Sequence, residues 1–328
     1  MNALATGIGV VIIGRNEGPR LERCLASLIG VAQKIVYVDS GSTDGSVQMA
    51  HQRGVEVVEL DMSKPFTAAR ARNEGFACLQ RVSPQVRYIQ FVDGDCEVVA
   101  GWLPEALAFL EARPEVAVVC GRRRERFPQR SIYNYMCDLE WDTPVGEAKA
   151  CGGDALMRAD AFAAVSGFRA DMIAGEEPEL CVRLRGQGWK VWRLAEEMTL
   201  HDAGMTRFGQ WWRRTLRGGY AFAEGAFLHG ATPEQHWQRE SRRAWFWGLG
   251  IPVATIIASL MLGGWGLLVL LIYPLQIARL ARRGDGSVRK NWLLAFFLVL
   301  GKFPEMLGQT RFLLNRFGAG KSALIEYK

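Results

Sequence analysis

Two carboxylates flank a single glycine directly after an apolar segment of the chain. Asp93 and Asp95 follow residues 86–92, whose aromatic and β-branched side chains predict a buried strand. Carboxylates at the carboxyl end of a parallel strand lie where open α/β sheets bind their ligands. Hard oxygen ligands suit Mg2+ or Mn2+, so the pair predicts a divalent-cation site that could hold a diphosphate.

A further carboxylate ends another apolar segment in the same way. Asp39 closes residues 34–39 and precedes a turn of small and polar residues, Ser40–Gly45, that lets a ligand approach the backbone. Thr43 or Asp44 can cap the helix that follows, but capping does not account for Asp39. The repeated placement strengthens the prediction of a ligand site at this edge of the sheet.

The elements that position these carboxylates alternate between strand and helix. This alternation predicts an α/β fold of the Rossmann-like class, with a mostly parallel sheet flanked by helices. Residues 122–240 lose the alternation and are interpreted as the substrate-facing half of the same domain, which spans residues 1–240. The expected strands are residues 8–13, 34–39, 55–60, 86–95 and 116–121.

Charge is unevenly distributed along the chain. Residues 241–328 carry a net charge of +9, whereas residues 1–240 carry −3. A protein that binds nucleic acid is therefore not expected, and the basic excess is attributed to a membrane-associated tail. The 7 cysteines form no CxxC pair, which favours buried free thiols over a disulfide framework or a zinc site.

The tail begins with an unusually long uncharged segment. Residues 245–278 contain no charged side chain, and about 20 apolar residues already cross a bilayer. Because Gly263 and Gly264 lie in its middle, a hairpin of two short membrane helices is preferred to one long tilted helix. The basic loop 279–290 then faces the cytoplasm. No signal peptide is recognised at the first strand, so the catalytic domain is expected on the cytoplasmic side of the inner membrane.

The rest of the membrane-associated region, which spans residues 241–328, is less apolar. Lys302, Pro304 and Glu305 interrupt it, so residues 291–317 are expected to form an amphipathic helix at the membrane surface. A third membrane span is the alternative for this helix. For the tail as a whole, a pair of core helices in a soluble protein is the remaining interpretation.

Seven motifs between residues 8 and 225 together resemble family 2 glycosyltransferases. These are inverting enzymes with a GT-A fold that use nucleotide-diphosphate sugars. The resemblance implies a nucleotide-binding half over residues 1–121 and an acceptor half over residues 122–240. In the family order, the motifs are VVIIGRNE (10–17), VYVDSGSTDGS (36–46), ARNEG (71–75), FVDGD (91–95), GGDALMRADAF (152–162), GEEPEL (175–180) and QWWRR (210–214).

The resemblance implies donor-site roles for five residues. Asp39 would contact the nucleobase and Asp93 the ribose. Asp95 would hold the metal ion on the diphosphate, with Asp93 as a second candidate ligand. Arg72 and Asn73 match a donor-site motif, with exposed polar residues on a helix as the alternative interpretation.

An acidic pair, Glu176 and Glu177, matches the family position of the catalytic base. Inverting transfer needs a carboxylate that removes the acceptor's proton as its oxygen attacks the anomeric carbon. Adjacent helical residues point about 100° apart, so only one of the two can face the sugar. Glu177 occupies the position of the family's usual Asp and is preferred over Glu176, whose charge also suits a helix N-terminus. An acceptor phosphate would need little deprotonation.

The QWWRR segment resembles a QxxRW motif of membrane-bound family members, with Arg214 in place of the Trp. Arg213 and Arg214 carry a permanent charge and paired donors that suit a diphosphate leaving group. Trp211 and Trp212 suit either an acceptor tunnel or the membrane interface. A strand pair is also expected near residues 190–201. His201 at its end is a candidate third metal ligand, with a structural histidine as the alternative.

These observations favour a membrane-anchored inverting glycosyltransferase that depends on a divalent cation. It would transfer a sugar from a nucleotide-diphosphate sugar to a lipid-linked acceptor at the cytoplasmic face, in cell-envelope or exopolysaccharide synthesis. The alternatives are a processive polysaccharide synthase, which needs enough membrane helices to form a channel, and a catalytically inactive membrane scaffold that has kept the fold.

Overall fold

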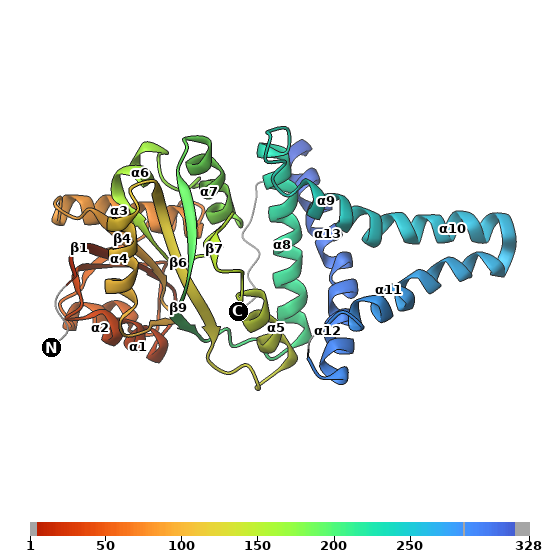
Figure 1. Cartoon of the computed structure of the whole chain (residues 1–328), viewed down its shortest axis with the longest axis horizontal. Coiled ribbons are helices and arrows are strands. Elements are labelled where there is room, and N and C mark those ends of the chain that lie inside the picture. The colour runs from red at the N-terminus through yellow and green to blue at the C-terminus, as the bar shows by residue number, and fades with distance from the viewer. Residues whose placement is uncertain (1–4, 285, 319–328) are drawn as a thin grey trace. The chain divides into compact units, whose positions relative to one another are not determined.

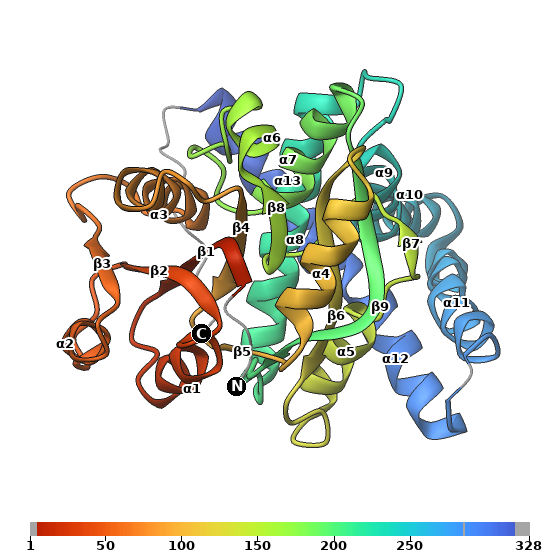
Figure 2. The same ribbon diagram turned by 60° about the vertical axis from the view of Figure 1, so that its left-hand side comes forward.

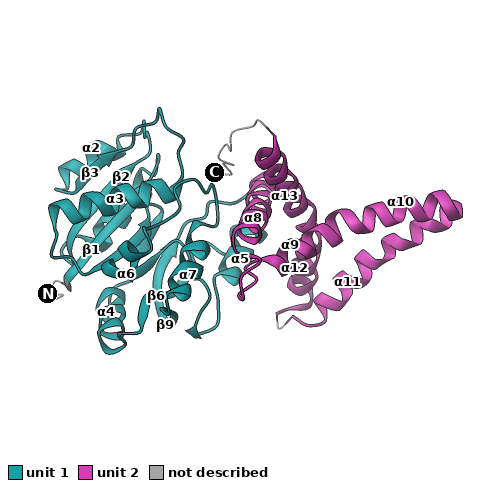
Figure 3. Cartoon of the chain, turned by 90° about the horizontal axis from the view of Figure 1, so that it is seen from above, with its two compact units in different colours: residues 1–206 teal, residues 207–328 magenta. Residues whose placement is uncertain are grey.

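The computed structural model describes residues 5–284 and 286–318 of the chain. Two compact units adjoin in sequence at Thr206 and Arg207, and Figure 3 shows them in different colours. The first unit is an α/β domain and the second is helical. Part of the predicted catalytic domain, residues 207–240, therefore belongs to the helical unit. The functional boundary at residue 240 stays a prediction.

The first half of the sheet consists of parallel strands joined by helices. Its elements are β1 (Ala5–Gly14), α1 (Pro19–Leu28), β2 (Ala32–Asp39), α2 (Ser46–Gln52), β3 (Glu56–Glu59), α3 (Ala68–Val82) and β4 (Tyr88–Asp93). The strand order is β3-β2-β1-β4, which Figure 2 shows with β1 between β2 and β4. Leu21, Leu25 and Leu28 are fully buried because they share one face of α1.

The second half of the sheet is mixed, because the chain returns to it in both directions. Its elements are β5 (Cys96–Val98), α4 (Trp102–Ala112), β6 (Val116–Glu125), α5 (Ile132–Glu140), β7 (Gly146–Glu147), β8 (Ala155–Arg158), α6 (Ala159–Ala164), α7 (Glu176–Gly186) and β9 (Lys190–His201). Strand β8 is antiparallel to both β4 and β6, and β9 is parallel to β6 but antiparallel to β5. The α/β fold with helices flanking the sheet is confirmed, and parallel pairing dominates only its first half.

A glycine allows α3 to lie directly on the first two strands. A Cβ on Gly75 would lie 2.3 Å from Cγ1 of Val11 and 2.8 Å from Cγ2 of Val38. Contacts this short are sterically forbidden, so only glycine permits this packing. The close approach brings Arg72, which lies one turn earlier on α3, within reach of the end of β4.

The second unit is built from helices that follow one another closely. They are α8 (Phe208–His229), α9 (Gln238–Trp245), a π-helical segment (Phe246–Gly250), α10 (Ile251–Leu262), a 3-10 segment (Gly263–Leu271), α11 (Ile272–Ala281), α12 (Val288–Leu300) and α13 (Lys302–Phe317). Helices α8 and α13 pack with their backbones nearly in contact. A Cβ on Gly308 would lie 2.0 Å from the carbonyl oxygen of Leu216, and one on Gly219 would lie 2.0 Å from that of Glu305.

The uncharged segment 245–278 reverses direction at Gly263, which has a φ of +62°. Helix α10 leads to this turn and α11 leads back from it, so the segment forms the expected hairpin (Figure 1). Among the described residues, the helical run Gln238–Ala281 is the one candidate membrane span by length and composition, with a mean hydropathy of 2.3. Leu260 and Met261 near the turn are 82% and 79% exposed. Membrane insertion of the hairpin remains a prediction.

Residues 291–317, expected as one amphipathic helix, instead belong to α12 and α13. The two helices meet at Gly301, and Pro304 lacks the N–H that an uninterrupted helix would use at that position. The expectation of a single helix is corrected on this point. A location at the membrane surface stays a prediction.

Candidate active site

The carboxylate of Asp39 holds the turn that follows β2. Its Oδ2 accepts hydrogen bonds from the backbone N–H groups of Gly41 and Ser42 at 2.9 and 2.8 Å. Its Oδ1 accepts a hydrogen bond from the hydroxyl of Tyr37 at 2.8 Å, and burial together with the Asp39 charge raises the pKa of that hydroxyl. Asp39 therefore shapes this turn, and its contact with a nucleobase stays a prediction.

Arg72 links the end of β4 to the start of α7. Its Nη2 donates to Oδ1 of Asp93 at 2.7 Å, and its Nη1 donates to Oε1 of Glu176, also at 2.7 Å. Burial alone would lower the pKa of Arg72, but the charges of Asp93 and Glu176 outweigh it and raise that pKa. Arg72 is thus a buried cation between two carboxylates and not an exposed polar residue of a helix.

Asn73 lies beside Arg72 on α3 but uses its side chain to hold another loop. Its Nδ2 donates to the carbonyl oxygen of Phe168 at 2.7 Å, and its Oδ1 accepts from the N–H of Phe168 at 2.9 Å. These two bonds fix the segment that precedes α7. They give Asn73 a structural function, and its predicted contact with the donor remains untested.

Arg123, which is partly buried, and Asp154, which is fully buried, complete the surroundings of Asp93. Arg123 at the end of β6 donates from Nη2 to Oδ2 of Asp93 at 3.2 Å, and its Nε lies 3.6 Å from Oδ2 of Asp154. Asp154 also accepts hydrogen bonds from the N–H of Asp93 at 3.0 Å and from Oγ1 of Thr199 at 2.8 Å. Sequence reasoning missed both residues, although Arg123 lies in the basic segment RRRER (122–126) and Asp154 in the motif GGDALMRADAF (152–162).

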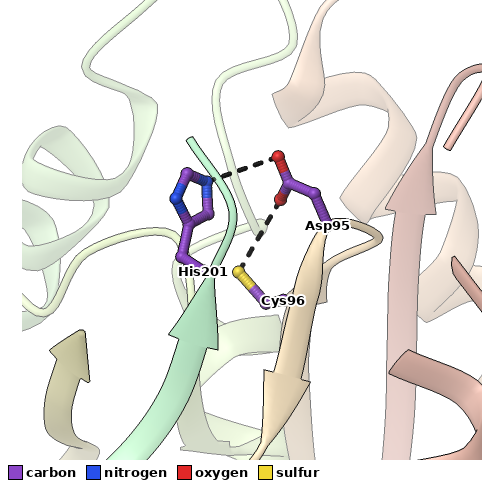
Figure 4. A group of neighbouring side chains, drawn as sticks. All are labelled: Asp95, Cys96 and His201. Carbon is purple, nitrogen blue, oxygen red and sulfur yellow. Dashed lines mark hydrogen bonds and ion pairs between the residues drawn. The ribbon is translucent and has the colours of Figure 1, made fainter. Parts of the chain in front are cut away.

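Asp95 lies next to Cys96 and His201 at the junction of β5 and β9 (Figure 4). Nε2 of His201 is 3.3 Å from Oδ2 of Asp95, and Sγ of Cys96 is 3.7 Å from its Oδ1. Cys96 and His201 are directly opposite each other in the antiparallel ladder, so their side chains lie on the same face of the sheet. The expected association of His201 with Asp95 is therefore present in the structure.

This group has the donor chemistry of a divalent-cation site. The carboxylate, thiol and imidazole ligand atoms all lie within 4.8 Å of one another. Burial, followed by the positive charge of Arg123, lowers the pKa of His201 and favours the neutral imidazole that can coordinate a metal. On the other side of the ring, Nδ1 lies 3.7 Å from Oε2 of Glu125, where a carboxylate can orient a metal-binding histidine. These residues fit a divalent cation.

Glu176 and Glu177 are adjacent but have different partners. Gly175 precedes them in the left-handed region at φ +79°, and α7 begins directly after it. Glu176 faces Arg72, whereas Oε1 of Glu177 accepts from the N–H and Sγ of Cys151 at 2.6 and 2.9 Å. Burial raises the pKa of Glu177, although hydrogen bonds from Cys151 oppose the shift. The two glutamates therefore diverge as the helical geometry predicted.

The predicted diphosphate ligands Arg213 and Arg214 lie on α8 of the second unit. Nε of Arg213 donates to the carbonyl oxygen of Gly209 at 3.3 Å, within the same helix. Trp211 is 3% exposed, and its ring packs edge-on against Phe297 with centroids 5.0 Å apart. Trp211 thus belongs to the core of the helical unit, and the roles of the two arginines stay predictions.

Comparison of the sequence with protein families matches residues 9–163 to the family described as glycosyl transferase family 2. The succinoglycan biosynthesis protein ExoA of Rhizobium meliloti is 29% identical over 199 residues, which cover 56% of this chain and 59% of that protein. The O-antigen chain rhamnosyltransferase RfbN of Salmonella typhimurium is 24% identical over 53% of this chain and 58% of that protein. The chain thus spans less than two thirds of the length of these relatives.

Solved structures share the fold at low sequence identity. A mannosyltransferase of Pyrobaculum calidifontis, PcManGT, in complex with GDP-Man and Mn2+, has a TM-score of 0.61 at 16% identity. The matched region covers 94% of this chain and 88% of that structure. TarS of S. aureus has a TM-score of 0.53 at 12% identity and covers 93% of this chain and 55% of that structure.

Proposed function

Because the chain carries a glycosyltransferase family 2 domain with the GT-A fold, we propose that it is an inverting glycosyltransferase. Its donor is a nucleotide-diphosphate sugar. Its acceptor is a lipid-linked molecule at the cytoplasmic face of the inner membrane. The proposal places the reaction in polysaccharide synthesis, because the names of two relatives refer to succinoglycan and to an O-antigen chain.

The observation that carries the proposal is the position of Arg72 between Asp93 and Glu176. This buried guanidinium ties the end of β4, the expected donor site, to the start of α7, the expected base site. Arg72 lies 21 positions before Asp93 and 104 positions before Glu176, so three separate segments of the chain meet at one side chain. Such an arrangement supports transfer chemistry, in which the donor carbon and the acceptor oxygen must be held together.

In the proposed mechanism, Glu177 accepts the proton of the attacking acceptor oxygen. Its burial raises its pKa, which makes its ionised form a stronger base than an exposed glutamate. Glu176 is less suited to this role because it is engaged with the permanent charge of Arg72. Hydrogen bonds from Cys151 and Cys181 fix the orientation of the Glu177 carboxylate.

Asp95 and His201 would hold a divalent cation, with Asp93 directed instead toward Arg72 and Arg123. A bound Mg2+ or Mn2+ supplies charge neutralisation to the diphosphate leaving group. That PcManGT was solved with GDP-Man and Mn2+ supports this assignment. Arg213 and Arg214 are proposed as additional cationic groups for the same diphosphate.

The exposed apolar hairpin is the observation that supports a lipid-linked acceptor. Leu260, Met261 and Trp265 near its turn are 82%, 79% and 75% exposed, an arrangement that suits lipid rather than water. Arg279 lies in the last turn of α11, the returning limb, and Arg282 and Arg283 directly follow it. These charges favour a cytoplasmic location for that end. A transferase anchored in this way meets acceptors that are themselves in the membrane.

The proposal is tested by incubating membranes that contain the chain with radiolabelled UDP-, GDP- and dTDP-sugars. We expect one donor class to label a lipid-extractable product. The labelling should disappear in Asp95→Asn and in the presence of EDTA. Labelling that is equal in Asp95→Asn and the wild type would contradict the assignment of the donor site.

A further inference from the structure

A second group of potential metal ligands lies at the start of α7, separate from Asp95, Cys96 and His201. Sγ of Cys151 and Sγ of Cys181 are 3.8 Å apart, and Oε1 of Glu177 lies 2.9 and 3.1 Å from them. All three side chains are buried. The two sulfurs approach the same carboxylate oxygen, so the group converges on one point.

The spacing of the sulfurs matches a tetrahedral metal site. Two thiolates bound to one Zn2+ at about 2.3 Å lie about 3.8 Å apart when the ligand angle is tetrahedral. The observed separation of Cys151 and Cys181 is 3.8 Å. A zinc-bound carboxylate oxygen lies about 3.6 Å from such sulfurs, so Glu177 has to retreat by about half an ångström to join them.

Hydrogen bonds hold the group together in the absence of a metal. The thiols of Cys151 and Cys181 both donate to Oε1 of Glu177. A divalent ion would offset the charge of two thiolates and a carboxylate, and its binding would release the thiol protons to solvent.

The loop that carries Cys151 offers a route to the group. Gly152 directly follows Cys151 in the left-handed region at φ +81°, and a Cβ built on it would meet nothing within 4 Å. The backbone beside the buried sulfur is thus open. An ion could reach the ligands by displacement of this short loop, without opening the sheet.

We propose that Cys151, Glu177 and Cys181 form a site for a thiophilic divalent ion of the Zn2+ type. The site is distinct from the candidate cation site at Asp95. Its effect on catalysis rests on the proposed function, because a metal on Glu177 withdraws the carboxylate that accepts the acceptor's proton. Zinc is then an inhibitor of this chain, acting at a site other than that of the cation held on the donor.

The binding claim is tested by anaerobic titration of the reduced, full-length chain with Co2+, which reports thiolate ligands by a charge-transfer absorption. We expect this absorption in the wild type, and we expect Zn2+ to abolish it. The band should be lost in Cys151→Ser and in Cys181→Ser, and the affinity for Co2+ should fall by more than about 100-fold. Loss of a residue that only hydrogen-bonds a metal ligand costs about 10–100-fold. It should persist in Cys96→Ser and in Cys78→Ser, a matched buried cysteine on α3.

No charge-transfer band in the wild type, or a band that is lost in Cys96→Ser and kept in Cys151→Ser, would overturn the site. If a serine variant does not fold, Glu177→Gln keeps both thiols and must still weaken Co2+ binding at least about 10-fold. The band does not depend on transferase activity. If the predicted spectra are observed but no sugar transfer is detected, the proposed function is refuted and the metal site is not. With activity present, Zn2+ should inhibit the wild type more strongly than Cys181→Ser, each relative to its own rate without zinc.

Discussion

At the residue scale, the two glutamates that open α7 differ in the partners that burial gives them. Glu176 is paired with the fixed charge of Arg72, whereas Glu177 lies among thiol and backbone donors. A carboxylate bound to a guanidinium is held in place by charge-assisted hydrogen bonds. A carboxylate with a raised pKa can exchange a proton closer to neutral pH. The pair therefore divides structural and chemical tasks between neighbours.

The pH dependence of turnover should report the Glu177 environment. A base acts in its ionised form, so the rate should rise with pH through a pKa above the ordinary glutamate value of 4.5. The thiol of Cys181 donates to the ionised carboxylate and opposes that rise in pKa. Cys181→Ala should therefore move the acid limb of the kcat profile to higher pH. A shift of equal size in Cys78→Ala would show that the Cys181 contact is irrelevant.

Replacement of Glu176 should act on stability. Glu176→Gln removes one of the two charges that compensate the buried Arg72, and we expect a loss of about 2 kcal/mol in the free energy of unfolding. This loss exceeds the effect expected for a charge at a helix terminus alone, because the substitution also breaks the ion pair with the buried Arg72. The sequence did not reveal this ion pair. Urea unfolding of the variant checks the value. An unchanged midpoint would contradict the ion pair.

At the element scale, the sequence predicted the first half of the sheet better than the second. The expected strands 8–13 and 34–39 lie within β1 and β2, because apolar β-branched segments need burial on both faces wherever they occur. The antiparallel entry of β8 between β4 and β6 was not predictable, since strand direction depends on distant pairing. Asp154 precedes β8, which is why its contact with Asp93 also escaped sequence reasoning.

The candidate site was predictable in its residue types and not in its pairing. His201 was a candidate partner of Asp95 and lies beside it, because Asp95 directly precedes β5, whose first residue pairs with His201 at the end of β9. Cysteine spacing argued against zinc, but Cys151 and Cys181 are brought together by tertiary structure across 30 positions. The periodicity of a helix or strand predicts which way a side chain points from its own element. It does not predict which side chains of other elements that side chain contacts.

The packing of α3 on the sheet gives a prediction at this scale. Gly75→Ala places a methyl group 2.3 Å from Val11 Cγ1, so the helix must move away from β1. We expect a loss of about 1–3 kcal/mol in the free energy of unfolding, the usual cost of overpacking. Gly186→Ala at the end of α7, where a Cβ would meet nothing within 4 Å, is the matched control and should not destabilise the chain. Equal effects of the two substitutions would contradict the close approach.

At the scale of the whole molecule, the proposal joins a catalytic unit to a membrane-bound tail. The exposed apolar hairpin and the basic residues after it are the features that bear on topology. All 7 cysteines are buried, so an introduced cysteine can be labelled against a low background. Labelling therefore tests where the turn and the basic loop lie.

We expect an impermeant maleimide to label Gly264→Cys in intact cells, because the turn of the hairpin would reach the outer surface. Ser287→Cys, in the basic loop, should be labelled only after the cells are permeabilised. Fluorescence of the purified protein after gel separation measures both. Labelling of Ser287→Cys in intact cells would overturn the hairpin topology.

The central claim is that Glu177 accepts the acceptor's proton in a sugar transfer from a nucleotide-diphosphate donor. The most direct test is the rate of transfer by Glu177→Gln, measured together with donor affinity by calorimetry. Loss of the base should lower kcat by about 10²–10⁴-fold while the donor Kd stays nearly unchanged, because the amide keeps the shape of the side chain. A rate equal to that of the wild type would contradict the claim and indicate an acceptor that arrives already ionised, such as a phosphate.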